Sequence, residues 1–178
     1  MRSSRPYKSP LAAMLWSLVL PGFGQIYNKN YYIGTILLVL EFLINLKSHL
    51  NIVLLDTLTG DLLHAHDSVN YSWGLFYPSI YGFALWQAFN MAISNNNLLE
   101  GNGVEKRTYL SGFFIGLVIG MDFGLFWHDT DIIQRFSFLD YPVFNGLIFG
   151  LLFGLLAHLA EIKIYRRKLK RLLFNDYI

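Results

Sequence analysis

Residues 109–127, YLSGFFIGLVIGMDFGLFW, and residues 141–160, YPVFNGLIFGLLFGLLAHLA, decide the fold class. Each has about the 20 mostly apolar residues that a helix needs to cross the hydrocarbon core of a bilayer. Two further segments, 31–50 and 73–93, are similar, although Glu41, Asn45 and Lys47 interrupt the first. We therefore predict an all-α polytopic membrane bundle with four full spans.

The composition supports a membrane protein. Of the 178 residues 54% are hydrophobic and 15% are charged, whereas soluble domains carry about 25% charged residues. The chain has no cysteine, which excludes disulfides, thiolate nucleophiles and cysteine metal sites. The length indicates one membrane domain over 1–178.

The first apolar stretch, residues 11–20, is half a span long and ends at Pro21-Gly22, where a regular helix cannot continue. If residues 11–28 cross the membrane, the chain has five spans and its basic ends lie on opposite sides. If they form a short re-entrant or interfacial helix, four full spans leave twelve of the fourteen Lys and Arg residues inside. The positive-inside rule favours the second topology, a multi-pass cell-membrane protein with both termini cytoplasmic.

Two amphipathic segments flank the spans. In 51–72, the apolar residues Ile52, Leu55, Leu58 and Leu62 recur at helical spacing, which indicates a short helix on the outer surface. The tail, 161–178, mixes six Lys and Arg residues with leucines, so we expect it to rest on anionic inner-leaflet headgroups. Because the basic residues flank apolar segments, we expect no nucleic-acid partner.

Glycines recur at every fourth position in the last two predicted spans. Residues four apart share one helix face, and such small-residue faces let helix backbones approach closely in lipid. We expect the two helices to pack on each other, and a homo-oligomer or a pore-lining arrangement is the alternative. The glycines are Gly112, Gly116, Gly120 and Gly124 in one span, and Gly146, Gly150 and Gly154 in the other.

Two carboxylates, Glu41 and Asp122, lie within predicted spans. A charge in the bilayer is costly, so such residues usually face the bundle interior or water. They are candidates for moving protons or cations or for holding a polar substrate. The alternative is a structural role, with hydrogen bonds to polar side chains such as those of Asn45, Gln87, Asn90 or Asn145.

Histidine and aspartate gather in two predicted outer segments. Imidazole and carboxylate suit zinc or another transition metal, but nothing in the sequence brings the two segments together, and polar surface residues are the simpler interpretation. The residues are His64, His66, Asp67, His128, Asp129 and Asp131. Near the opposite face, His158 and Glu161 are three apart on a predicted helix and are expected to pair.

Residues 8–34, KSPLAAMLWSLVLPGFGQIYNKNYYIG, resemble a bacterial family of small membrane proteins of unknown function, marked by a P-G-x-G-Q-x-Y-N hairpin and itself similar to the two-transmembrane-helix domain. The resemblance implies a small bacterial membrane protein with a tightly turned N-terminal hairpin and no catalytic residues. In such a hairpin the glycines allow the chain to reverse, and Gln25 and Asn28 are expected to satisfy groups of the turn. The match rests on Pro21, Gly22, Gly24, Gln25, Tyr27, Asn28 and Gly34.

The chain contains no nucleophile elbow, metalloprotease motif, phosphate-binding loop or dinucleotide fingerprint. We therefore expect a non-enzymatic component without a cofactor, which acts through helix contacts with a membrane partner or with copies of itself. The alternatives are a small transporter or channel that uses Glu41 and Asp122, and a membrane enzyme with an outer His/Asp metal site.

Overall fold

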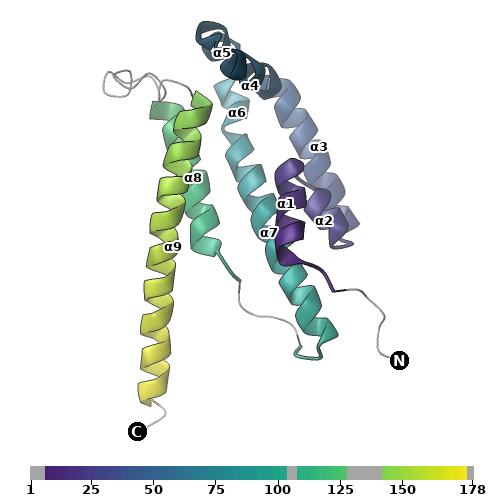
Figure 1. The fold of residues 1–178 in the computed structure, drawn as a ribbon, viewed down its shortest axis with the longest axis vertical. Coiled ribbons are helices and arrows are strands. Elements are labelled where there is room, and N and C mark those ends of the chain that lie inside the picture. Colours follow the sequence, from purple (N-terminus) through teal and green to yellow (C-terminus); the bar gives the residue numbers. More distant parts are fainter. Residues whose placement is uncertain (1–6, 104–107, 128–141, 176–178) are drawn as a thin grey trace. The chain divides into compact units, whose positions relative to one another are not determined.

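The computed structural model describes residues 7–103, 108–127 and 142–175, with every side chain except those of Leu62, Leu63, His66, Pro142 and 169–175. Over these residues the chain is helical and contains no strand, so the all-α class is confirmed (Figure 1). The chain forms two compact units, Met1–Tyr109 (unit 1) and Leu110–Ile178 (unit 2).

Unit 1 holds seven helices in its described residues, and local signals set most of their ends. They are α1 (Pro10–Val19), α2 (Phe23–Tyr27), α3 (Tyr31–Ser48), α4 (Leu50–Thr59), α5 (Leu62–Ser68), α6 (Tyr71–Gly74) and α7 (Phe76–Leu99). The side chains of Ser9, Asn30 and Asp61 cap α1, α3 and α5 by accepting backbone N–H groups.

In unit 1, α1 packs on α7, and α2 packs on α1, α3 and α7 (Figure 1). Ala13 of α1 meets Ala88 and Ala92 of α7 in a fully buried cluster, with Tyr27 packed beside it. Because alanine has no side chain beyond Cβ, these two helices come close together. The predicted outer segment forms two separate helices, α4 and α5, because Gly60 (φ +86°) ends α4.

Unit 2 is a pair of helices, α8 (Ser111–Trp127) and α9 (Pro142–Asn175). The last predicted span and the basic tail are one continuous helix of 34 residues. At about 1.5 Å per residue its length is about 51 Å, against about 30 Å for a hydrocarbon core.

Two helical stretches in the described residues are long and apolar enough to cross a membrane, Tyr31–Ser48 and Val143–Lys168. They correspond to two of the four predicted spans. The helices of the other two predicted spans, α7 and α8, are too polar or too short to meet the same test. Helix α8 is apolar but has 17 residues, and α7 has 24 residues but carries Gln87, Asn90 and the Asn95–Asn97 run.

Candidate functional site

The Pro21-Gly22 turn joins α1 to α2 at a point where two backbones touch. Gly22 has φ +109°, and a Cβ placed there would lie 2.5 Å from the carbonyl oxygen of Gly34. A Cβ on Gly34 would in turn lie 3.0 Å from the oxygen of Gly22. The two glycines therefore allow α2 to rest on the start of α3, and Pro21 is buried at the turn.

The side chains of Gln25 and Asn28 donate hydrogen bonds to α7. The sequence predicted instead that they would satisfy groups of the turn. Gln25 Nε2 donates to the Ala84 carbonyl at 2.8 Å and to Gln87 Oε1 at 2.9 Å, and Gln25 Oε1 accepts from the Ser17 hydroxyl at 3.3 Å. One turn further along α7, Asn28 Nδ2 donates to the Ala88 carbonyl at 2.8 Å. The fully buried Gln25 thus ties α1, α2 and α7 together.

The segment before α1 is fastened to the far part of α7. The Lys8 backbone exchanges two hydrogen bonds with the side chain of Asn96, at 2.9 and 2.7 Å. The Lys8 ammonium lies 4.4 Å from the ring centroid of Tyr27, and the Tyr27 hydroxyl accepts from the Ser9 N–H at 3.3 Å. Asn96 holds this segment, as Ser17 holds Gln25, yet neither residue belongs to a recognisable sequence motif.

Glu41 is the buried carboxylate of unit 1, with 5% of its surface exposed. Its Oε1 accepts from the Tyr77 hydroxyl at 3.0 Å, and the Tyr77 and Tyr81 hydroxyls lie 3.3 Å apart. Its Oε2 is buried without a hydrogen-bond partner. In the sequence, the only sign of this cluster is that Tyr77 and Tyr81 are four residues apart and so share one helix face. Tyrosines near the start of a predicted span are equally typical of anchoring at the headgroups.

Three of the four amides weighed as partners for the carboxylates have other partners. Gln87 bonds Gln25, Asn90 bonds the backbone of Tyr109 at 2.6 and 3.0 Å, and Asn145 donates to the Gly124 carbonyl at 2.7 Å. Asn45 lies beside Glu41 and is a hydrogen-bond partner of its carboxyl group, as the structural alternative expected.

Asp122 belongs to unit 2, and its Oδ1 is buried without a partner. Asp122 lies two residues from both Gly120 and Gly124, so its side chain points about 200° around α8 from the glycine face.

The glycines of unit 2 line the contact between α8 and α9. A Cβ at Gly116, Gly120 or Gly124 would lie 2.3–2.6 Å from a backbone carbonyl oxygen of α9. At Gly112 that distance is 2.8 Å, and Gly150 and Gly154 approach α8 backbone oxygens at 3.1 and 3.0 Å. Gly146 has more room, at 3.4 Å. Beside the glycines, the Phe123 ring packs on those of Phe149 and Phe153.

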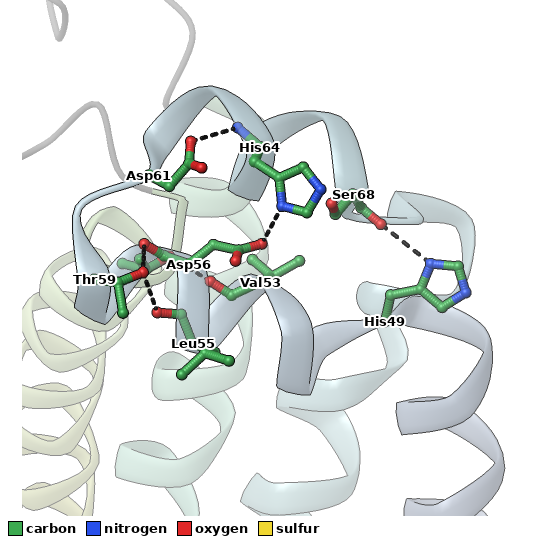
Figure 2. A network of polar contacts seen from close by, with 9 residues as sticks. His49, Val53, Leu55, Asp56, Thr59, Asp61, His64 and Ser68 are labelled. Atoms are coloured by element: carbon green, nitrogen blue, oxygen red, sulfur yellow. Dashed lines mark hydrogen bonds and ion pairs between the residues drawn. The ribbon is translucent and has the colours of Figure 1, made fainter.

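The first His/Asp segment lies where α4 meets α5, and residues 49–68 of these two helices are called the α4–α5 cap (Figure 2). The exposed His64 Nδ1 lies 2.7 Å from Asp56 Oδ2, and His49 Nδ1 lies 3.3 Å from the Ser68 carbonyl. The hydrogen bond to Asp56 and the negative charges of Asp56, Asp61 and Asp67 raise the pKa of His64.

His128, Asp129 and Asp131 lie outside the described residues, as does the side chain of His66. Within the part of the chain that is described, no three His, Asp or Glu side chains form a group that could hold a metal ion. The predicted His158–Glu161 pair is confirmed, at 3.3 Å.

Residues 6–49 match a protein family of unknown function, DUF5683, and this stretch contains α1, α2 and α3. No curated protein and no solved structure matches the chain.

Proposed function

We propose that this protein is a non-enzymatic integral membrane component that acts through helix contacts with a membrane partner or with copies of itself. The observation that carries the proposal is an inverted distribution of side chains. Alanine, glycine and polar residues such as Gln25 and Asn145 are buried, while many of the largest apolar side chains are exposed. Soluble proteins have the opposite pattern, whereas small and polar residues pack helices within lipid.

The proposed topology has four full spans, 31–50, 73–93, 109–127 and 141–160, with α1 as a short re-entrant or interfacial helix. At about 15 Å, α1 reaches half-way across a hydrocarbon core of about 30 Å. The charge distribution supports cytoplasmic termini, as in the sequence argument. On this topology the basic end of α9, with Lys163, Arg166, Arg167 and Lys168 exposed, reaches the anionic inner headgroups.

The partner is expected on faces that unit 1 and unit 2 leave uncovered. On α3, Val39 is 51% exposed, and on α9, Leu156 is 57% exposed. A photoreactive amino acid at either position should form a protein adduct of defined mass in native membranes. The same group at Ala88, which is fully buried, should react only within the chain. Lipid adducts alone at both exposed positions would contradict the proposal.

A second candidate is a small transporter or channel. It is favoured by the two carboxylate oxygens that are buried without a partner, Glu41 Oε2 and Asp122 Oδ1. If these groups move protons or cations, Glu41→Gln and Asp122→Asn should preserve folding and expression but abolish flux and any phenotype of the gene. A well-folded double variant with unchanged flux and phenotype would exclude transport and leave the accessory function.

A further inference from the structure

Helix α9 continues beyond the part that a bilayer can cover. Counted from Val143, about 20 residues at about 1.5 Å each span a hydrocarbon core of about 30 Å and end at Ile162. The helix runs on to Asn175. Because no Gly or Pro follows Gly154 in α9, the sequence provides no bend into the membrane plane. The extension therefore leaves the bilayer in the direction of the span.

Apolar side chains continue along one face of α9 into this extension. They follow a heptad repeat, in which the first (a) and fourth (d) residues of every seven form one seam. Within the bilayer most residues of α9 are apolar, so the repeat is informative from Ile162 (a) and Tyr165 (d) onward, and the sequence repeats it at Leu169 and Leu172. The α9 seam comprises, among the residues with described side chains, Ile148, Leu151, Leu155, His158, Ile162 and Tyr165.

The α9 seam is not the face that contacts α8. Gly150 and Gly154 meet α8, and Leu155 lies about 100–140° around the helix from them. Leu155 and Tyr165 are both exposed. An apolar strip outside the hydrocarbon core is unfavourable in water, and a second helix with the same repeat covers it.

The charges beside the seam fit a second copy of the same helix. Two copies that share one membrane topology present α9 in the same direction, so they pair as parallel helices. In such a pair, the residue that precedes an a position lies beside the residue that follows the next d position on the other helix. Glu161 precedes Ile162 and Arg166 follows Tyr165, so this contact joins opposite charges.

Both charged side chains are accessible to a partner. The Glu161 side chain is 31% exposed. Arg166 is exposed and has no ion pair within the described residues. Lys163 and Arg167 occupy heptad positions away from the seam, so pairing leaves them free to reach the headgroups.

We propose that two copies of this protein pair through the α9 seam as a parallel two-stranded coiled coil, with Glu161 of each copy bonded to the partner's Arg166. The coiled coil begins within the bilayer and continues into the basic extension. This inference rests on the proposed function, since it names the partner as a second copy and the contact surface as the α9 seam.

Because the chain has no cysteine, single cysteines report the seam directly in membranes of cells that express the full-length protein. Leu155→Cys (on the seam) and Leu156→Cys (off the seam) are a matched pair, because both leucines are 57% exposed and adjacent. Ile162→Cys and Lys163→Cys repeat the comparison at the end of the hydrocarbon core. On brief oxidation, each seam variant should form disulfide-linked homodimers at least fivefold faster than its neighbour, as measured by non-reducing gel electrophoresis. Equal rates within both pairs would reflect random encounters and overturn the proposal.

The charge contact has a separate test in the Leu155→Cys background. Glu161→Arg should slow disulfide formation at least fivefold, because it places like charges beside each other. Adding Arg166→Glu should restore the rate, since the opposite charges then meet in reverse. Residues five apart on one helix are not neighbours, and the exchange does not rebuild the His158–Glu161 contact, so recovery reports contact between copies. A double variant as slow as Glu161→Arg alone would overturn the Glu161–Arg166 contact.

Failure of this inference is distinguishable from failure of the proposed function. Protein adducts from the photoreactive groups at Val39 or Leu156, without seam disulfides, would exclude a second copy on the α9 seam and leave the accessory function standing.

Discussion

At the scale of single residues, Gln25 makes more connections than its place in the sequence suggests. Its amide contacts Ser17 of α1 and both Ala84 and Gln87 of α7, within 3.3 Å in each case. A buried amide with both ends satisfied fixes the relative register of the helices that it joins.

Replacing Gln25 by leucine should therefore destabilise unit 1, since it leaves Ser17 and Gln87 without that partner. The expected loss is about 1–3 kcal/mol in the free energy of unfolding. Thermal unfolding in a mild detergent measures it, with Asn102→Ala, at an exposed loop position, as the control. Equal midpoints for the two variants would show that the amide contacts are dispensable.

His64 supplies a pH-dependent contact in the α4–α5 cap. Asp56 raises the pKa of His64 above its ordinary value of 6.5, first through the hydrogen bond and then through charge. A raised pKa in the folded state means that the contact is fully stabilising below pH about 6.5 and is lost as the pH rises through the higher folded value.

An NMR titration of the imidazole signals should show His64 titrating above a model peptide, and Asp56→Asn should move its pKa back toward 6.5. If the asparagine variant leaves the titration unchanged, the Asp56 contact is absent in solution.

The motif residues show where inference from sequence stops at this scale. The composition of the turn pointed to a chain reversal, and Gly22 with its positive φ occupies it. The acceptors of Gln25 and Asn28 lie about 60 residues away in α7, and no local pattern encodes a partner at that distance. The Tyr77 partner of Glu41 escaped prediction for the same reason.

At the scale of helices, α8 and α9 pack through their backbones. The contact follows the four-residue repeat, with Gly116, Gly120 and Gly124 each close to one carbonyl of α9. Any side chain at these positions separates the helices and loses contacts along both faces.

Gly116→Leu and Gly150→Leu should each lower the unfolding midpoint of the purified protein by far more than Leu151→Ala. A Cβ at Gly116 already meets the Phe153 oxygen at 2.4 Å, and at Gly150 it meets Met121 Cγ at 2.5 Å. Leu151 is 52% exposed, so its truncation leaves no cavity. Glycine variants as stable as the wild type would contradict this packing.

Helix positions were easier to predict than helix lengths. The predicted spans 31–50 and 109–127 coincide closely with α3 and α8, because aromatic and capping residues mark their ends. The predicted span 141–160 is part of a longer helix, since α9 continues to Asn175. After residue 160 the sequence of α9 changes from apolar to basic, which favours water or headgroups over lipid chains. The change does not interrupt the backbone hydrogen bonds, so the helix continues.

At the scale of the whole molecule, the absence of cysteine makes the proposed topology directly measurable. Single cysteines can be placed at Ser3, at Thr59 in the α4–α5 cap and at Asn102 after α7, and treated with a membrane-impermeant maleimide in intact bacterial cells. Thr59 and Asn102 are exposed in the structure, so labelling depends on their side of the membrane.

With four spans and cytoplasmic termini, only Thr59→Cys should be labelled in intact cells, and all three variants should be labelled after permeabilisation. The reason is electrostatic, since this arrangement keeps twelve of the fourteen Lys and Arg residues inside. Labelling of Ser3→Cys in intact cells would establish the five-span alternative, in which residues 11–28 cross. Labelling of Thr59→Cys and Asn102→Cys from the same side would show that α7 does not cross, so that its Asn95–Asn97 end and the α4–α5 cap face the same medium.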